Sequence, residues 1–165
     1  MFDGLYPKGL QWYWKGDFVR GLPDGAIDVH LDYAAKVPNE ISGMHLYPID
    51  GAIHRKGAGA TAWSCRDATW SMVIIGVDPD PKNAPKVKRW AQDYWKAIHP
   101  FDLAGAYPNF MMADEGEARL RASFGGNYPR LAALKEKFDP ANLFSVNLNI
   151  PPATNTHAAQ AARSA

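Results

Sequence analysis

The sequence Thr69-Trp70-Ser71-Met72-Val73-Ile74-Ile75-Gly76-Val77 is an almost continuous apolar run, and Asp78-Pro79-Asp80-Pro81 follows it. Such a run predicts a strand that is buried on much of both faces. The prolines end this strand, because proline has no N–H to donate to a neighbouring strand. Residues 85–98 then predict a helix with one wide apolar stripe. The stripe consists of Val87, Trp90, Ala91, Tyr94, Trp95 and Ile98.

The segments before this unit predict two more strands and one more helix. The aromatic run Leu10–Trp14, closely followed by Phe18 and Val19, favours a strand. A helix is expected from Pro23 to Lys36, with an apolar face made of Ile27, Leu31, Ala34 and Ala35. Pro38 marks the end of that helix. A second strand is expected over Met44–His54, with a bulge at Gly51, before a glycine-rich turn at residues 57–60.

The segments after the unit predict a strand over Gly105–Met112 and a helix over Tyr128–Phe138. Asn127 can cap this helix, and Pro129 falls in its first turn, where a missing N–H costs nothing. Its expected apolar face is Leu131, Leu134 and Phe138. Residues 153–165 are small and polar and predict a disordered tail. Strands joined by both turns and helices predict an α+β fold, an antiparallel sheet covered on one face by helices.

The composition describes one globular domain without a charge bias. The chain has 165 residues, of which 47% are hydrophobic, and a net charge of +1. This balance gives no electrostatic reason to expect nucleic acid or an anionic membrane as a partner. No apolar run reaches the length of a membrane span, and the first residues do not resemble a signal peptide. The single cysteine, Cys65, excludes an internal disulfide and favours a reducing, cytoplasmic compartment.

Several common kinds of site are missing from the sequence. It contains no glycine-rich phosphate loop, and its five histidines show no metal-ligand spacing, so we expect no metal site. The carboxylates Asp114, Glu115 and Glu117 suit general acid–base chemistry, but a solvated turn leading to two arginines is the favoured interpretation. Cys65 has no base near it in the sequence, and a buried small apolar role is favoured over a nucleophile.

Tyr107 and Asn109 are the most informative polar pair. They lie two residues apart on the expected strand Gly105–Met112, so their side chains should share one face. A phenol with a hydrogen-bonding neighbour can accept a proton from a substrate hydroxyl. Two polar side chains on a buried face also need partners for structural reasons alone, and composition favours this second interpretation.

The residues that follow Gly105 carry a family resemblance. Four segments, 106–110, 124–128, 139–144 and 147–152, resemble in order and spacing the carboxyl-terminal module of berberine bridge enzyme-like, FAD-linked oxidases. Residues 3–18 and 60–67 resemble parts of the same family's substrate domain. The resemblance therefore divides the chain into a substrate-domain-like region (1–104), a berberine bridge enzyme-type carboxyl-terminal module (105–152) and a tail (153–165).

The resemblance implies roles for four residues. Tyr107-Pro108-Asn109 matches the family's Tyr-x-Asn, which makes Tyr107 the expected catalytic base beside the flavin and Asn109 its cofactor-side partner. Asn147 and Asn149 lie in a segment that is expected to return to the FAD-binding domain and to contact the cofactor. Tyr13 and Trp14 are expected to help cover the substrate side of the flavin.

Three residues depart from the family pattern. Cys65 stands where histidine is usual, and Leu148 stands where glutamine is common, which removes one polar group near the cofactor. Pro108 lies inside Tyr-x-Asn and implies an edge or bulged strand.

The resemblance implies the substrate-binding half of an FAD-dependent oxidoreductase. Such an enzyme oxidises an alcohol, sugar or related C–H donor by hydride transfer to flavin. The FAD would be held mainly by a domain that these residues do not contain, so the isolated chain is expected to be incomplete and inactive without an FAD-binding domain or subunit. The alternative is a non-catalytic module, left from a truncated flavoenzyme, that binds a ligand or a protein.

Overall fold

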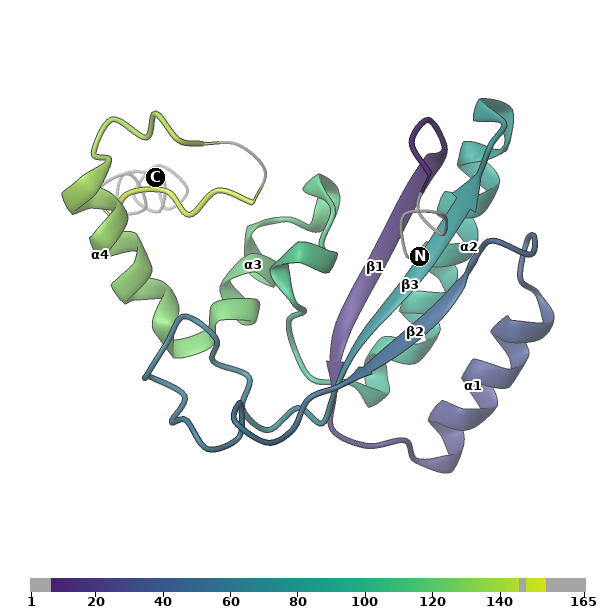
Figure 1. The fold of residues 1–165 in the computed structure, drawn as a ribbon, viewed down its shortest axis with the longest axis horizontal. Coiled ribbons are helices and arrows are strands. Elements are labelled where there is room, and N and C mark those ends of the chain that lie inside the picture. Colours follow the sequence, from purple (N-terminus) through teal and green to yellow (C-terminus); the bar gives the residue numbers. More distant parts are fainter. Residues whose placement is uncertain (1–6, 146–147, 154–165) are drawn as a thin grey trace, which may run out of the picture.

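The computed structural model describes residues 7–145 and 148–153, which include a three-stranded antiparallel sheet (Figure 1). The strands are β1 (Gln11–Val19), β2 (Gly43–Pro48) and β3 (Trp70–Asp78), in the order β1-β3-β2. The central strand β3 is the apolar run that the sequence marks as most deeply buried. It pairs with β1 from Gln11↔Asp78 to Val19↔Trp70 and with β2 from Gly43↔Ile75 to Pro48↔Trp70.

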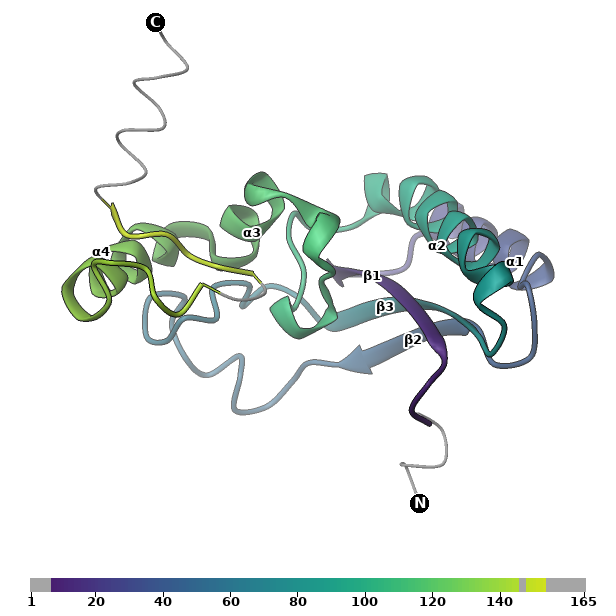
Figure 2. The same ribbon diagram turned by 90° about the horizontal axis from the view of Figure 1, so that it is seen from above.

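Two helices, α1 (Asp24–Ala35) and α2 (Ala84–Ile98), lie on the same side of the sheet (Figure 2). Because side chains alternate along a strand, one set of residues from the three strands points toward these helices. Tyr13, Val19, Met72 and Ile74 form a buried core there with Trp90, Ala91, Tyr94 and Ile98 of α2. The predicted α+β class, with helices on one face of an antiparallel sheet, is therefore confirmed.

The predicted buried face of α1 is wrong. Ile27 and Leu31 are 42% and 65% exposed, whereas Ala26 is buried and Val29 and Tyr33 pack against the core. The Tyr33 ring stacks on Tyr94 of α2, with ring centroids 4.7 Å apart. The helix is therefore rotated so that a small residue and an aromatic one meet α2, and its larger aliphatic side chains point away.

The strand predicted over Met44–His54 is shorter than expected. β2 ends at Pro48, which has no backbone N–H to continue the pairing. Residues after it form turns, and Gly51 adopts a positive φ of 57°. A turn therefore stands where the sequence predicted a bulge.

The strand predicted over Gly105–Met112 is also wrong. Residues Pro108–Phe110 form a 3₁₀ turn, η4, in which the Phe110 N–H donates to the Tyr107 carbonyl at 2.8 Å. Proline at the first position of this turn has the right φ and loses no hydrogen bond, so it favours the turn over a strand. Just before this segment, Leu103 forms an isolated antiparallel bridge with Phe18 of β1.

Four further elements of the described residues follow η4, namely the short 3₁₀ turns η5 (Ala113–Glu115) and η6 (Gly125–Asn127) and the helices α3 (Glu117–Phe124) and α4 (Tyr128–Phe138). The bounds of α4 match the prediction, whereas α3 was not predicted. The Asn127 side chain does not cap α4 and instead donates to the carbonyls of Ala58 and Thr61.

The predicted apolar face of α4 is mostly wrong, because Leu134 and Phe138 are exposed while Tyr128 and Ala132 are buried. Tyr128 and Ala132 pack with Leu120 of α3 and with Leu148 and Ile150. The carboxyl-terminal segment is therefore anchored on α3 and α4. Of the expected tail, only Ala153 is described. No helix within the described ranges has both the length and the hydropathy needed to cross a membrane.

Candidate active site on the open face of the sheet

The face of the sheet opposite α1 and α2 carries a hollow of about 350 Å³ with an aromatic lining. Two tryptophans of β1 and two aliphatic residues of β3 form its floor, because alternate residues of each strand point to this side. Tyr47 of β2 and residues of η4 complete the lining. The lining residues are Trp12, Trp14, Tyr47, Val73, Ile75, Asn109 and Phe110. None of them carries a charge.

A second hollow, of about 610 Å³, shares Trp14 and Asn109 with the first. Its other walls are residues 108 and 111–113, together with Leu148 of the carboxyl-terminal segment. The indole nitrogen of Trp14 is buried and has no hydrogen-bond partner within residues 7–145 and 148–153. The open face is therefore an uncharged, largely apolar surface, and Asn109 stands between the two hollows.

Tyr107 and Asn109 meet at the edge of this surface. The Asn109 Nδ2 donates to the Tyr107 Oη at 2.7 Å. The Tyr107 ring lies between Trp63 and Phe110, with ring centroids 5.4 Å and 5.2 Å away. The predicted proximity of the two polar side chains holds, although the expected reason, alternation on a strand, does not. The 3₁₀ turn brings them together instead.

Gly16 of β1 explains how η4 lies so close to the sheet. A Cβ at this position would be 3.2 Å from the Phe110 Cβ and 2.8 Å from the Met72 carbonyl oxygen. Both distances are shorter than ordinary van der Waals contact. Glycine is therefore required for Phe110 to pack against β1, and Phe110 in turn contacts Tyr47, with ring centroids 5.4 Å apart.

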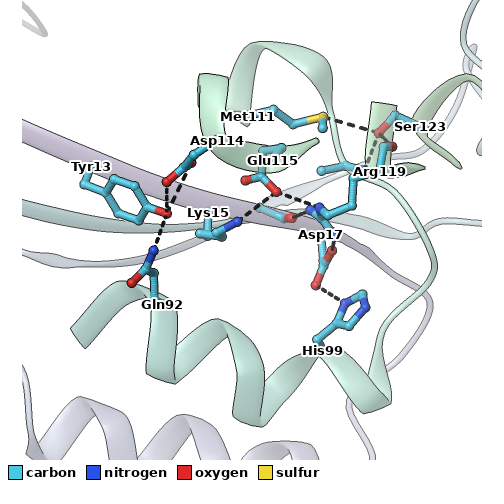
Figure 3. A network of polar contacts seen from close by, with 12 residues as sticks. Tyr13, Lys15, Asp17, Gln92, His99, Met111, Asp114, Glu115, Arg119 and Ser123 are labelled. Atoms are coloured by element: carbon cyan, nitrogen blue, oxygen red, sulfur yellow. Dashed lines mark hydrogen bonds and ion pairs between the residues drawn. The ribbon is translucent and has the colours of Figure 1, made fainter. Parts of the chain in front are cut away.

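A buried ionic network fixes the segment after η4 to the same strand (Figure 3). The Glu115 carboxylate lies 2.9 Å from Lys15 Nζ and 2.7 Å from Arg119 Nε. Arg119 also pairs with Asp17 at 2.8 Å and donates to the Gly16 carbonyl at 2.5 Å. The side chains of Asp17 and Glu115 are fully buried. The solvated turn predicted for the acidic cluster is therefore wrong at Glu115, which serves in a buried ion pair.

The other two carboxylates of that cluster are nearer the surface. Asp114 accepts hydrogen bonds from Lys88 at 2.9 Å and from Tyr13 at 3.2 Å. Burial, with the negative charge of Asp114 nearby, raises the pKa of Tyr13 to about 12. Glu117 pairs with Arg121 one helical turn later, in the exposed manner that the sequence predicted.

Two titratable groups at the far end of the network have shifted pKa values. His99 Nδ1 lies 2.8 Å from the Asp17 carboxylate, and this hydrogen bond raises the pKa of His99. Burial, with the Asp17 charge as a second cause, raises the pKa of Asp102 to about 7. Both groups lie behind the sheet rather than on its open face, so we assign them a structural role.

The remaining predicted site residues have varied outcomes. Asn149 is half-buried between Leu148 and Ile150, which pack on α3 and α4, and Asn147 lies outside the described residues. Cys65 is half-buried against the cluster around Phe18, and burial raises the pKa of its thiol, in keeping with a small apolar role. Within the described residues, no group of three His, Cys, Asp or Glu side chains could hold a metal ion.

Sequence reasoning assigned one residue to the wrong face and missed three others. Tyr13 and Trp14 were both expected on the substrate side, but neighbours on a strand face opposite ways. Tyr13 points toward α2, and of these two residues Trp14 is the one on the open face. Trp12, Tyr47 and Phe110 were not singled out. The alternation of Trp12 and Trp14 was the available signal for the first, whereas the other two depend on strand pairing and on the turn at Pro108.

The chain is similar in sequence to one known family and to several FAD-linked proteins. The family described as "Berberine and berberine like" matches residues 106–151. An FAD-linked oxidoreductase of Dictyostelium discoideum is 26% identical over 157 residues, which cover 94% of this chain and 34% of that protein. The aclacinomycin-N/aclacinomycin-A oxidase of Streptomyces galilaeus is 26% identical over 140 residues, covering 74% of this chain and 25% of that protein.

Solved structures show the same fold. The berberine bridge enzyme-like 1 protein of Physcomitrella patens superposes with a TM-score of 0.70 at 25% identity, over 79% of this chain and 28% of its own. A glycopeptide hexose oxidase superposes with a TM-score of 0.76 at 24% identity, over 86% of this chain and 32% of its own. The chain therefore spans about a third or less of the length of these proteins.

Proposed function

Because the chain belongs to the berberine bridge enzyme-like, FAD-linked oxidases, we propose that it forms the substrate side of an FAD-dependent oxidoreductase. The proposed substrate is an alcohol, a sugar or a related C–H donor. Bound FAD supplies the hydride acceptor for this reaction. The single observation that carries the proposal is the Asn109–Tyr107 hydrogen bond of 2.7 Å at the edge of an uncharged aromatic hollow.

The lining of the open face fits one part of the cofactor. A flat isoalloxazine ring suits the uncharged surface made by Trp12, Trp14 and Phe110. The two hollows have no charged residue in their lining, so they do not suit the pyrophosphate of FAD. We therefore propose that an FAD-binding domain or subunit holds the pyrophosphate, and that residues 1–104 and 105–152 together face it.

The proposed chemistry of the chain's own residues is proton transfer. As the phenolate, Tyr107 accepts the proton of the substrate hydroxyl on Oη and becomes the neutral phenol, while Asn109 Nδ2 donates to the same oxygen and stabilises the negative charge that it carries beforehand. Trp63 and Phe110 hold the ring of Tyr107 from two sides, which fixes the position of the oxygen. In this scheme Asn109 contacts both the catalytic oxygen and the ligand, and Asn149 is retained as a cofactor-side residue together with Asn147.

The cofactor part of the proposal is tested by flavin titration of the purified chain and of its complex with an FAD-binding domain. We expect stoichiometric flavin only in the complex, because the described hollows offer no cation to a pyrophosphate. Stoichiometric flavin on the chain alone would contradict this division. The reaction is tested by anaerobic mixing of the FAD-loaded complex with a panel of alcohols and sugars. Loss of the oxidised flavin absorbance is expected, and reduction by dithionite but by no panel member would refute the substrate class.

A non-catalytic interaction module is the second candidate, and the exposed aromatic and aliphatic side chains after α4 favour it. Phe138, Leu143 and Phe144 are 74%, 78% and 81% exposed, which is unusual for large apolar residues so close together in the chain. Such a surface suits contact with another protein, including an FAD-binding domain. Substrate-dependent flavin reduction would favour the oxidoreductase, because a binding module has no reason to support it.

A further inference from the structure

The helix side of the molecule carries a groove that the proposed oxidoreductase function does not use. It lies between α1 and α2 and has a volume of about 590 Å³. These two helices lie on the opposite side of the sheet from the aromatic hollows (Figure 2). Residues from the end of α1, from η2 (Pro81–Asn83) and from the first half of α2 line it. They are Tyr33, Lys36, Lys82, Pro85, Lys86, Arg89, Trp90 and Asp93.

The groove has a concentration of positive charge that the chain as a whole lacks. Four cations and one carboxylate line it, whereas the net charge of the whole chain is only +1. Lys36 is paired with Asp32 of α1, and Asp93 is paired with Lys96. Lys82, Lys86 and Arg89 form no ion pair within the described part of the chain. A groove lined by one sign of charge concentrates counter-ions of the opposite sign.

The amino terminus of α2 adds to this potential. The helix dipole places partial positive charge at this end, and the 15-residue helix has no acidic residue in its first turn. Its start continues from η2, so the Ala84 N–H donates to the Pro81 carbonyl, and the Asp80 carboxylate accepts from the Lys82 N–H. The dipole therefore adds positive potential to the groove, whereas these two N–H groups are already bonded.

Two aromatic side chains line the deeper part of the groove. Tyr33 is stacked on Tyr94, which holds its ring in place. Trp90 is only 9% exposed, and its indole N–H has no hydrogen-bond acceptor among the residues that the structure describes. The nitrogen itself is buried, so it lies out of reach of a ligand in the groove, to which the two rings offer an apolar wall.

We propose that this groove is a binding site for a small molecule that carries two or more linked phosphate groups. Arg89 would bind one phosphate through the paired N–H groups of its guanidinium, and Lys82 and Lys86 would act as point charges on the next. The positive end of the α2 dipole would add to this attraction. This proposal does not depend on the oxidoreductase function, because the groove and the open face lie on opposite sides of the sheet.

The test is a titration of the folded 165-residue chain with inorganic pyrophosphate at constant ionic strength, followed by calorimetry and by amide chemical shifts. We expect saturable binding with shifts confined to α1, η2 and the start of α2, and weaker binding of orthophosphate. Arg89→Gln and Lys86→Gln should each reduce the affinity by roughly tenfold, the loss of one charge-assisted contact. Raising the salt concentration should also weaken binding.

Matched controls come from exposed cations elsewhere. Arg130→Gln and Lys137→Gln, both on α4, should leave the affinity unchanged. Absence of saturable binding would overturn the proposal, as would equal losses in the groove and control variants or shifts located away from the groove. Every variant is exposed, so a retained thermal unfolding transition confirms that the fold is intact.

Discussion

Asn109 Nδ2 donates a hydrogen bond of 2.7 Å to Tyr107 Oη, across the 3₁₀ turn that Pro108 begins. The two side chains come from positions that would also share a face on a strand, but the turn brings their polar ends into direct contact. The donor occupies one lone pair of Tyr107 Oη, and in the phenolate form the oxygen has further lone pairs with which to accept a proton. The relationship supports Tyr107 as the proposed catalytic base and Asn109 as the residue that orients it.

Tyr107→Phe should slow the chemical step of the FAD-loaded enzyme by about 10²-fold or more, because general base catalysis is lost while the ring remains. The measurement is single-turnover flavin reduction under anaerobic conditions. Tyr33→Phe is the matched control, since Tyr33 lies on the helix side of the sheet and should leave the rate unchanged. An unaltered reduction rate in Tyr107→Phe would exclude the proposed base.

Gly16→Ala should lower the free energy of unfolding by about 1–3 kcal/mol, the usual cost of inserting a methyl group into a packed region. The added Cβ would be 2.8 Å from the Met72 carbonyl oxygen and 3.2 Å from the Phe110 Cβ. Urea denaturation measures the change. Gly43→Ala is the control, because a Cβ on that strand residue meets nothing within 4 Å. Equal stability losses at both positions would show that the effect comes from glycine replacement in a strand and not from crowding of η4.

The sequence was sufficient to predict the elements that have a strong local signal. The apolar run that became β3 and the wide stripe of α2 have a clear period, and both were found close to the expected bounds. The face of α1 was not predictable in the same way. Its aliphatic residues suggested one side, but the stacking of Tyr33 on Tyr94 decided the other, and that contact exists only in the folded chain.

The candidate site was also predictable only in part. The family resemblance singled out Tyr107 and Asn109, and the structure places their side chains in contact. The prediction of a strand there failed because the local effect of Pro108 was stronger than the apolar pattern. Glu115 was assigned to solvent because charged residues are normally exposed. One partner, Arg119, lies four residues later, but the other, Lys15, lies 100 positions earlier in the chain, a separation at which spacing carries no signal.

Arg119→Met should lower the free energy of unfolding by about 3–5 kcal/mol, because it leaves the buried carboxylates of Asp17 and Glu115 with too little positive charge. Arg121→Met is the control. Its ion pair with Glu117 is partly exposed, so the loss should stay within about 1 kcal/mol. Chemical denaturation of both variants at neutral pH makes the comparison. Similar losses for the two arginines would show that burial does not strengthen the dependence on Arg119.

Asp102→Asn should reduce the pH dependence of stability between about pH 4 and pH 7. Burial raises the pKa of Asp102 to about 7, above the value of about 3.9 expected for an unfolded chain. In that window the folded protein binds more protons at this site than the unfolded protein, so the free energy of unfolding falls as the pH rises. Asparagine cannot titrate, and this contribution to the fall should disappear in the variant.

The measurement is urea denaturation at several pH values, with Asp93→Asn as the control because Asp93 makes only an exposed pair with Lys96. His99 lies in the same region, and Asp17 raises its pKa above the ordinary value of 6.5. Its contribution has the same sign but lies at higher pH, since it is complete below about pH 6.5 and is lost as the pH rises through the raised value. The slope of the free energy of unfolding against pH should therefore differ most between the wild-type and Asp102→Asn proteins below pH 6.5. Parallel curves throughout that range would show that Asp102 is not held protonated by its burial.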